Sequence, residues 1–429
     1  MPLLRYNIRR FFSRVVLAAM LLLCVSASVQ AQNYEVIYYF GYTDGYLPIG
    51  RLALDNAGNL FGTTALGGAD DVGTVFKLEF EHRRWVLDQL YNFTGAYLGG
   101  CGGHRDGGCP SGGVVRDASG ALYGTTSYGG AFGGGTVFRL SPSPKPPISG
   151  STPWNESILY SFSGSDGAHP ALGNLVLDPH GRLYGTTMSG GLNNCSGTCG
   201  TVFQLVPNGG TWSLRTIHYF AGPPNDGGVP YAGVTAGRLG QLYGTTAAGG
   251  TYGCGTVFRL TPSNSGTGWT ETVLYNFTGG TDGCAPWAGV AVDNLGNLYG
   301  ATTRSGANSG GTIFELSPSD GGWTYSLVFA MTGFGGPNAN LTLDKAGNLY
   351  GTTSADGAYG NGNVFEISPS NGLWTYTSLY DFTCQLDGCA PEGGVAIDAA
   401  GNLYGTTSGG GYYLNDCYGT CGVAWQITP

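Results

Sequence analysis

The sequence predicts an all-β protein, a seven-bladed β-propeller of four-stranded blades whose N-terminal strand completes the last blade. Three observations predict this fold. A unit of about 57 residues recurs seven times, each unit contains four short strand-like runs, and glycine and aromatic residues are both abundant.

The composition excludes the other glycine-rich classes. Glycine accounts for 79 of the 429 residues, and 13% of the chain is aromatic. Collagen would need glycine at every third position, and a disordered linker would lack the aromatic residues. A helical fold is disfavoured because each glycine costs a helix about 1 kcal/mol relative to alanine.

The repeat is marked by Leu-Tyr-Gly-Thr-Thr, followed about ten residues later by Gly-Thr-Val-Phe-x-Leu. We therefore predict one propeller domain over residues 32–429. The copies of the marker begin at Leu60, Leu122, Leu183, Leu242, Leu298, Leu349 and Leu403.

The fifth unit illustrates the four predicted strands, at residues 289–293, 298–300, 312–316 and 323–331. Each run is short, rich in β-branched or aromatic residues, and bounded by glycine or proline turns. A β-sandwich and a solenoid are the alternatives. A solenoid would need distinct capping units, and the sequence contains none.

The two ends of the chain predict how the ring closes. The last unit stops just after its third strand, at residue 429. Fourth strands end in a pattern such as residues 90–93, and the same pattern stands before the first unit at residues 37–40. The N-terminal strand is therefore expected to become the outer strand of the seventh blade, which removes the exposed sheet edges.

The repeated pattern resembles the GloVer-type tandem repeat of secreted bacterial proteins over residues 34–428. The resemblance implies a propeller fold and an export route. It implies no catalytic residue.

Residues 1–31 have the features of a signal peptide. Four arginines precede an apolar run at residues 15–25, which is too short to span a bilayer comfortably, and small residues lead up to a cleavage site near Ala31. No later segment is apolar enough to cross a membrane, so we expect no transmembrane segment in the mature chain. We expect a monomer that is secreted, periplasmic or at the cell surface.

The charge of the mature chain excludes one class of partner. Without residues 1–31 it has 14 basic and 27 acidic groups, a net charge of −13. Nucleic-acid binding needs a basic surface, so no nucleic acid is expected as a partner. Cations and neutral polymers are compatible with this charge.

The ten cysteines after residue 31 all fall on one predicted face. We call it the top face, and it holds the loops between second and third strands and the crossovers between blades. The bottom face holds the short turns. An exported chain with an even number of cysteines is expected to form disulfides, and a metal site is less favoured because most pairs lie within single loops. The predicted pairs are Cys101–Cys109, Cys195–Cys199, Cys254–Cys284, Cys384–Cys389 and Cys417–Cys421.

The crossovers share an Asp-Gly-x-x-Pro motif, from which the sixth blade departs with Gly333. Because the motif precedes the innermost strand, six carboxylates are expected around the top mouth of the central channel. Each aspartate could cap its own turn, or the ring could bind a cation, with Ca²⁺ the most compatible cofactor. The residues are Asp44, Asp106, Asp166, Asp226, Asp282 and Asp387.

Aromatic residues on the top face are candidate ligand-binding residues. Flat rings beside Asn and Asp suit sugar stacking, and the alternative is that they pack over the glycine backbone. The candidates are Tyr128, Phe132, Tyr252, Trp287, Tyr412 and Tyr413. The tryptophans that begin the fourth strands recur regularly and are expected to pack between blades.

No catalytic constellation breaks the symmetry of the repeat. The sequence contains no Gly-x-Ser-x-Gly elbow, His-Glu-x-x-His motif or phosphate loop. We therefore expect a secreted, non-enzymatic module that binds a glycan, a cell-surface polymer or a protein through the top-face loops. The alternative is a polysaccharide-acting hydrolase or lyase that uses top-face carboxylates.

Overall fold

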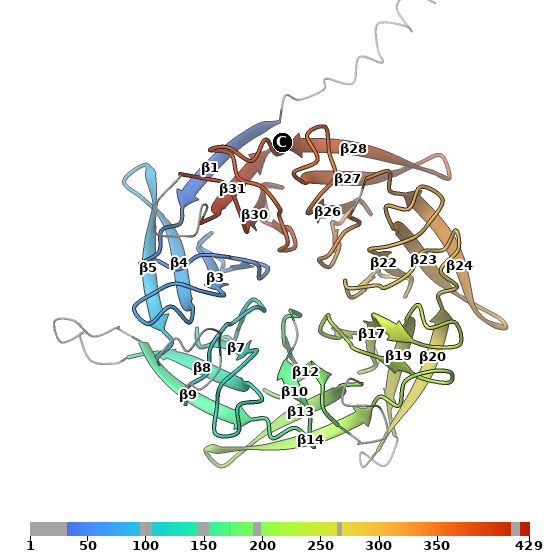
Figure 1. The fold of residues 1–429 in the computed structure, drawn as a ribbon, viewed down its shortest axis with the longest axis horizontal. Coiled ribbons are helices and arrows are strands. Elements are labelled where there is room, and N and C mark those ends of the chain that lie inside the picture. Colours follow the sequence, from blue (N-terminus) through green and yellow to red (C-terminus); the bar gives the residue numbers. More distant parts are fainter. Residues whose placement is uncertain are drawn as a thin grey trace, which may run out of the picture.

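A ring of seven four-stranded antiparallel sheets forms the protein (Figure 1). The computed structural model describes residues 32–94, 101, 105–143, 154–170, 172–191, 199–263, 268–333, 335–412 and 421–429. The described residues contain strands and loops and no helix, so they also contain no helix that could cross a membrane. The predicted fold, a seven-bladed propeller, is confirmed.

Blades 1 to 3 follow one another along the chain, each running from the innermost to the outermost strand. Blade 1 consists of β2 (Ala53–Leu54), β3 (Leu60–Thr64), β4 (Thr74–Glu81) and β5 (Arg84–Asn92). Blade 2 consists of β6 (Val115–Arg116), β7 (Leu122–Thr126), β8 (Thr136–Pro142) and β9 (Trp154–Ser161). Blade 3 consists of β11 (Val176–Leu177), β12 (Leu183–Ser189), β13 (Thr201–Asn208) and β14 (Thr211–Tyr219), and β10 (Ala168–Pro170) also pairs with β12.

Blades 4 to 6 repeat this order. Blade 4 consists of β16 (Thr235–Ala236), β17 (Leu242–Thr246), β19 (Thr256–Pro262) and β20 (Trp269–Asn276), with a small ladder of β15 (Gly227–Gly228) and β18 (Ala248–Gly249). Blade 5 consists of β21 (Ala291–Val292), β22 (Leu298–Thr302), β23 (Thr312–Ser319) and β24 (Gly322–Ala330). Blade 6 consists of β25 (Thr342–Leu343), β26 (Leu349–Thr353), β27 (Asn363–Ser370) and β28 (Leu373–Asp381).

Blade 7 joins the two ends of the chain. It consists of β29 (Ala396–Ile397), β30 (Leu403–Thr407), β31 (Val423–Thr428) and, on the outside, β1 (Asn33–Tyr39). β1 runs antiparallel to β31, from Asn33 opposite Thr428 to Tyr39 opposite Val423. Figure 1 shows β1 beside β31 on the rim of the ring. The predicted closure is confirmed.

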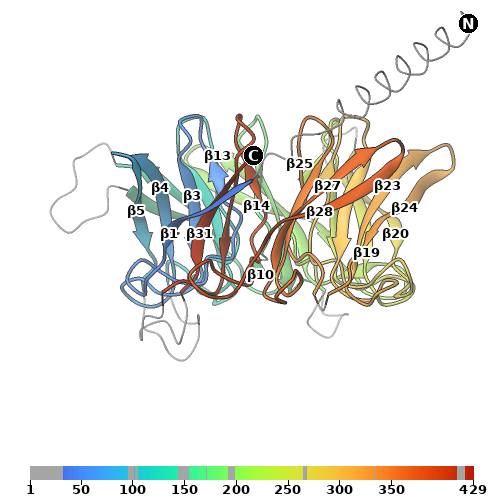
Figure 2. The same cartoon turned by 90° about the horizontal axis from the view of Figure 1, so that it is seen from above.

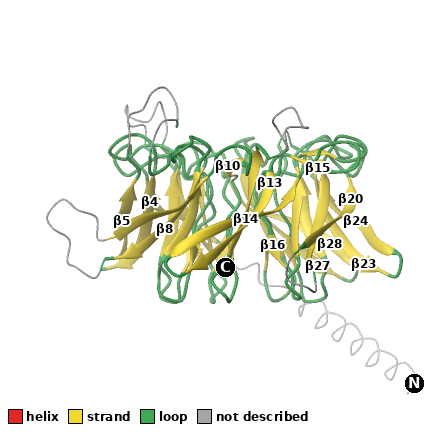
Figure 3. Ribbon diagram, turned by 90° about the horizontal axis from the view of Figure 1, so that it is seen from below, coloured by secondary structure: helices red, strands yellow, loops and turns green. Residues whose placement is uncertain are grey.

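The predicted and observed strands differ most at the axis. The run expected at residues 289–293 contributes only Ala291 and Val292 to a ladder. The third strand of the same blade runs on beyond the predicted residue 316 to Ser319. Inner strands are short because they converge on the channel, whereas outer strands have room to lengthen. In the side view of Figure 2 the blades stand upright around the axis, and in Figure 3 the top-face loops form the upper edge.

The hydrophobic core lies between consecutive blades. A phenylalanine at the end of one outer strand meets the third-strand phenylalanine of the next blade edge to face, as Phe93 meets Phe138 with ring centroids 5.2 Å apart. On the bottom side, the fourth-strand Trp212 packs on Tyr123 of the preceding blade at 6.1 Å. Such aromatic pairs add to the area that they bury. The fourth-strand tryptophans therefore have the packing role that their recurrence indicates.

Two glycines of the repeat are required by close approach. A Cβ at Gly62, in the Leu-Phe-Gly-Thr-Thr run, would lie 2.6 Å from the ring of Phe76. Gly45, which follows Asp44, has a φ of 98° and lies against the Thr64 side chain, where a Cβ would overlap the hydroxyl. These contacts explain why glycine recurs within strands and at the crossovers.

Candidate functional site

A cavity of about 330 Å³ occupies the centre of the ring, lined by the innermost strands and the residues just before them. Two positions of the repeat supply many of its lining residues. A buried Leu or Val immediately precedes each innermost strand. We call the residue three positions before it the mouth position and the residue directly before it the second position. The buried residues are Leu52, Val114, Leu175, Val234, Val290, Leu341 and Val395.

The mouth position holds a different residue in every blade. It follows the top-face crossover, and in five blades its residue lines the cavity: Ile49, Leu172, Trp287, Asn338 and Glu392. In order they are Ile49, Ser111, Leu172, Tyr231, Trp287, Asn338 and Glu392. A repeat that keeps its core residues seven times therefore varies where it meets the axis.

The second position is glycine in four blades and a long polar residue in three. The glycines are Gly113, Gly233, Gly289 and Gly394, and the polar residues are Arg51, Asn174 and Asn340. Each polar residue bonds back to the blade before it. Asn174 Oδ1 accepts from Gly113 N at 2.9 Å, Asn340 Oδ1 accepts from Gly289 N at 2.6 Å, and Arg51 Nε donates to Val395 O at 3.2 Å.

The Gly-Thr-Thr run holds this wall in place in blades 1, 3, 4 and 6. Its first threonine donates to a backbone carbonyl just before the innermost strand of the next blade. Thr63 Oγ1 donates to Gly112 O at 2.8 Å and Thr245 Oγ1 donates to Ala288 O at 2.7 Å. Because these threonines are buried and bonded, the backbone around the cavity is held by the repeated residues.

The cavity contains one cation and one acid that do not pair with each other. Burial lowers the pKa of Arg51 and raises the pKa of Glu392, and no charged neighbour contributes to either shift. Among the described residues, no carboxylate oxygen lies within 4.0 Å of the Arg51 guanidinium. Both groups line the same cavity.

Aromatic rings form one side of the mouth. Trp287 lines the cavity and stacks on Tyr231 of the preceding blade, with centroids 5.1 Å apart. The Arg304 guanidinium lies 5.7 Å from the centre of the Trp287 ring. These contacts hold Trp287 in one orientation beside the polar groups.

Of the five candidate aromatics that the structure describes, only Trp287 lines the cavity. Tyr128, Phe132, Tyr252 and Tyr412 belong to top-face loops of blades 2, 4 and 7 and are 40% to 69% exposed. Among the described residues, no two of these four rings are in contact; Tyr128 packs on His169 and Tyr412 on Tyr39. Tyr413 lies outside the described residues. The exposed rings therefore stand apart and do not form one platform.

The six motif aspartates do not surround the channel mouth, so the expected position is wrong. Each carboxylate bonds to the outer strand of the blade before it. Asp282 Oδ2 accepts from the Tyr275 hydroxyl at 3.0 Å and from Thr278 N at 2.8 Å. The crossover passes from the rim to the axis, and the motif stands near its start at the rim. The bonded pairs are Tyr38–Asp44, Tyr91–Asp106, Tyr160–Asp166, His218–Asp226, Tyr275–Asp282 and Tyr380–Asp387.

These contacts are those of a turn cap, the first of the two roles considered for the aspartates. Burial and then the Asp282 carboxylate raise the pKa of Tyr275, so its hydroxyl stays protonated and donates. Within the described part of the chain, no three His, Cys, Asp or Glu side chains form a group that could hold a metal ion. Calcium binding stays a prediction.

The junction between blades 5 and 6 departs from the other six in both partners. Phe329 replaces the tyrosine and Gly333 replaces the aspartate. The carboxylate of Asp356, from the β26–β27 loop, occupies the space that a side chain at position 333 would fill. Phe329 stacks on Tyr376 at 4.6 Å. The tyrosine hydroxyl and its acceptor are therefore absent together, as expected for two groups that satisfy each other.

Disulfides join Cys101 to Cys109, Cys254 to Cys284, and Cys384 to Cys389, as predicted. The Cys254–Cys284 bridge ties the third strand of blade 4 to the crossover that follows its outer strand. Cys199 and Cys421 are also disulfide-bonded, and their predicted partners Cys195 and Cys417 lie outside the described residues.

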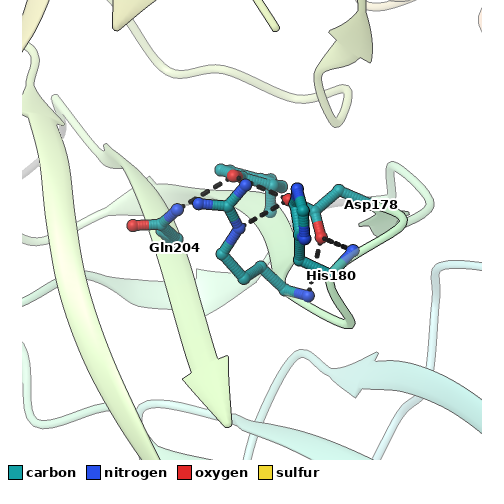
Figure 4. A network of polar contacts seen from close by, with 5 residues as sticks. Asp178, His180 and Gln204 are labelled. Atoms are coloured by element: carbon teal, nitrogen blue, oxygen red, sulfur yellow. Dashed lines mark hydrogen bonds and ion pairs between the residues drawn. The ribbon is translucent and has the colours of Figure 1, made fainter. Parts of the chain in front are cut away.

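The bottom face carries a second repeated aspartate, whose role is local. Figure 4 shows the example in blade 3. Asp178 Oδ1 accepts from the backbone of His180 and Arg182, at 2.8 and 2.9 Å, and Oδ2 accepts from Arg182 Nε and the Tyr184 hydroxyl. Burial alone would raise the pKa of Asp178, but the hydrogen bonds lower it below its usual value. Both oxygens of this carboxylate therefore serve to hold the turn.

The sequence analysis did not identify four polar residues of the cavity wall, Arg51, Asn174, Asn340 and Glu392. The signal that could have found them is their departure from the repeat. Three of them replace or align with a glycine that other units keep, and Glu392 replaces an apolar or aromatic residue. The Asp-Gly-x-x-Pro motif recurs in six blades, whereas the residues of the cavity wall vary from blade to blade.

The comparisons with known proteins agree with this architecture. The family model of the Gloeobacter/Verrucomicrobia repeat matches residues 24–199 and 173–420. The chain therefore belongs to this repeat family. No curated protein matches the sequence.

The comparison with solved structures gives matches with TM-scores below 0.5. A putative 6-phosphogluconolactonase from Bacteroides uniformis is 16% identical, with 81% of this chain and 88% of that chain covered and a TM-score of 0.48. An ulvan lyase is 12% identical, with 80% and 86% covered and a TM-score of 0.47. A putative oxidoreductase (glucose dehydrogenase) from Thermus thermophilus is 15% identical, with 92% and 100% covered and a TM-score of 0.40. No activity is carried over from these structures, because the likeness is confined to the fold.

Proposed function

We propose that the protein is an exported, non-enzymatic binding module that takes the end of a glycan, free or part of a cell-surface polymer, into the central cavity from the top face. The observation that carries the proposal is the wall of the cavity. Seven otherwise equivalent blades present different residues there, including Trp287, Arg51 and Glu392.

The size and chemistry of the cavity favour a glycan over a protein partner. About 330 Å³ is at the small end of ligand pockets, so it admits a small ligand or the end of a polymer and not a broad protein surface. An aromatic side chain beside hydrogen-bond donors and an acceptor suits a sugar ring with its hydroxyls. Disulfides support an extracellular site of action. Export itself stays a prediction, since residues 1–31 lie outside the described chain.

A glycan array and pull-down on bacterial cell-wall polymers test the proposal. Trp287→Ala is expected to weaken binding to any hit at least tenfold, because it removes one wall of the mouth. Tyr252→Ala is the matched control, an exposed aromatic on the same face, and is expected to bind like the wild type. Empty results in both assays would contradict the proposal. Binding lost in Tyr252→Ala but kept in Trp287→Ala would move the site to the loops.

A polysaccharide-acting hydrolase or lyase is the second candidate, and Glu392 favours it. Burial raises the pKa of this carboxyl, and a protonated acid beside a bound sugar is what glycosidic cleavage requires. Wild type and Glu392→Gln would be incubated with every polysaccharide that binds. New reducing ends or unsaturated products with the wild type alone would support this candidate, and no product would reject it.

A further inference from the structure

We propose that the ligand of the central cavity carries an anionic group, most simply the carboxylate of an acidic sugar, and that Arg51 is the residue that recognises it. This inference rests on the proposed function, because it names the chemical class of the ligand for the same cavity. The evidence for it is a set of side-chain N–H groups in the cavity wall that have no acceptor among the described residues.

Arg51 has donors to spare. A guanidinium has five N–H groups, and Arg51 uses one of them, Nε, to reach Val395 O on blade 7. No described residue accepts from Nη1 or Nη2, and no carboxylate lies within 4.0 Å. The side chain is anchored at Nε and lines the cavity. The remaining fork has the geometry that binds a carboxylate through two parallel hydrogen bonds.

The two asparagines add donors to the same wall. Asn174 and Asn340 each spend Oδ1 on a glycine N–H of the preceding blade. This contact orients the amide, so Nδ2 is the part of each side chain that remains to donate. No described group accepts from either Nδ2. The second position therefore presents donors from blades 1, 3 and 6, an arrangement complementary to an anion.

The unpaired charge of Arg51 also favours an anionic ligand. A partly desolvated cation without a counter-ion is costly, and the lowered pKa of Arg51 reflects that cost. The cost is relieved when a ligand brings the missing negative charge. Glu392 at the mouth is an acceptor without an ion-pair partner among the described residues and suits a hydroxyl of the same ligand. One charged group and neighbouring hydroxyls are the features of a uronic acid.

Binding of matched fragments tests the inference. Oligosaccharides of polygalacturonate, alginate and hyaluronan would be titrated by calorimetry against the wild type, each as the free acid and as its methyl ester. The ester removes the charge and keeps the skeleton. At least one acid is expected to bind ten times or more tighter than its ester, and added salt is expected to weaken that binding.

Arg51→Gln is expected to lose the preference for the acid while keeping its melting temperature within a few degrees, because Gln can still donate to Val395 O. Arg51→Lys, which keeps the charge without the fork, is expected to be intermediate. Leu239→Gln, at an exposed turn of the bottom face, is the control and is expected to match the wild type.

The outcomes separate the two proposals. Acid and ester binding equally tightly, or Arg51→Gln keeping the preference, would overturn the role of Arg51 and leave glycan binding intact. Binding of neutral glycans only on the array would overturn the anionic ligand alone. No binding of any fragment, together with an empty array, would overturn both.

Discussion

The rim of the blade junctions and the wall of the central channel are built from the same repeat by opposite rules. At the rim, six of seven junctions pair an aspartate with a tyrosine or histidine of the preceding outer strand. In the channel, the mouth position holds seven different residues. The repeated carboxylates accept hydrogen bonds that hold the junctions between blades. Arg51 and Glu392, in contrast, have no ion-pair partner among the described residues. In this propeller, recurrence marks structure and departure from recurrence marks the candidate site.

The largest expected effect comes from breaking a repeated rim contact. Asp282→Ala leaves the Tyr275 hydroxyl and Thr278 N without their acceptor at a buried position. The free energy of unfolding is expected to fall by about 2–3 kcal/mol, because the hydrogen bonds to the buried, charged Asp282 carboxylate are lost. Urea denaturation measures it.

Asp282→Asn is the matched control and is expected to lose less, since it keeps one oxygen acceptor. Binding of any ligand of the channel should be unchanged in both variants. A loss of stability below about 0.5 kcal/mol for Asp282→Ala, or a loss of ligand binding, would contradict the division between rim and channel.

A smaller effect is expected from placing the repeated aspartate at the junction between blades 5 and 6, which has glycine instead. Gly333→Asp would place two carboxylates in the space that Asp356 already occupies. A decrease of about 1–2 kcal/mol in the free energy of unfolding is expected from overpacking and like charge. Thermal or urea unfolding of the purified variants measures it.

The compensating change is the test of the explanation. Adding Asp356→Gly to Gly333→Asp recreates the arrangement of the other junctions and should recover most of the stability, and Phe329→Tyr should add to the recovery. Additive losses in the double variant would show that the two positions do not share one space.

The smallest effect concerns an outer-strand position that varies between blades. Glu156 stands where blades 1 and 3 have Leu87 and Leu214 and where blade 4 has Glu271. Burial, and then the nearby Asp106, raise the pKa of Glu156 to about 7. The unfolded chain ionises near the usual value of about 4.3, so this glutamate destabilises the folded state progressively as the pH rises through the window between these two values.

Glu156→Gln is therefore expected to melt higher than the wild type at pH 8, by about 1–3 °C, and at the same temperature at pH 4. Scanning calorimetry at both pH values measures the difference. Glu156→Leu, the residue of the neighbouring blades, should behave in the same way. Equal melting temperatures at pH 8 would mean that the carboxyl is not penalised by burial.

Much of the fold could be predicted because its signals are local and repeated. The Leu-Tyr-Gly-Thr-Thr run, the third-strand phenylalanine and the fourth-strand tryptophan each report a contact that recurs at every junction, as Phe93 with Phe138 illustrates. The pairing of β1 with β31 followed from a pattern found at both ends of the chain. Two disulfides followed from the spacing of cysteines within single loops. The Cys254–Cys284 disulfide followed from the strand order, which brings the two remaining cysteines together.

The candidate site was harder to predict because its members are single residues far apart in sequence. Arg51 and Glu392 are separated by almost the whole ring in sequence, yet the two residues belong to adjacent blades because the chain closes on itself. The aspartates were expected at the axis because they precede the innermost strands. Their place at the rim depends on the path of the crossover, which short-range patterns do not specify.

By itself the sequence determined the number of blades, the strands of each blade, the closure of the ring and the interfaces that hold it, because each of these repeats a local pattern of burial and turn chemistry. Only the tertiary structure decided which carboxylates accept hydrogen bonds within the fold and which charged groups have no ion-pair partner among the described residues. That outcome depends on distances between blades, where Tyr275 finds Asp282 at 3.0 Å and Arg51 finds a single backbone carbonyl.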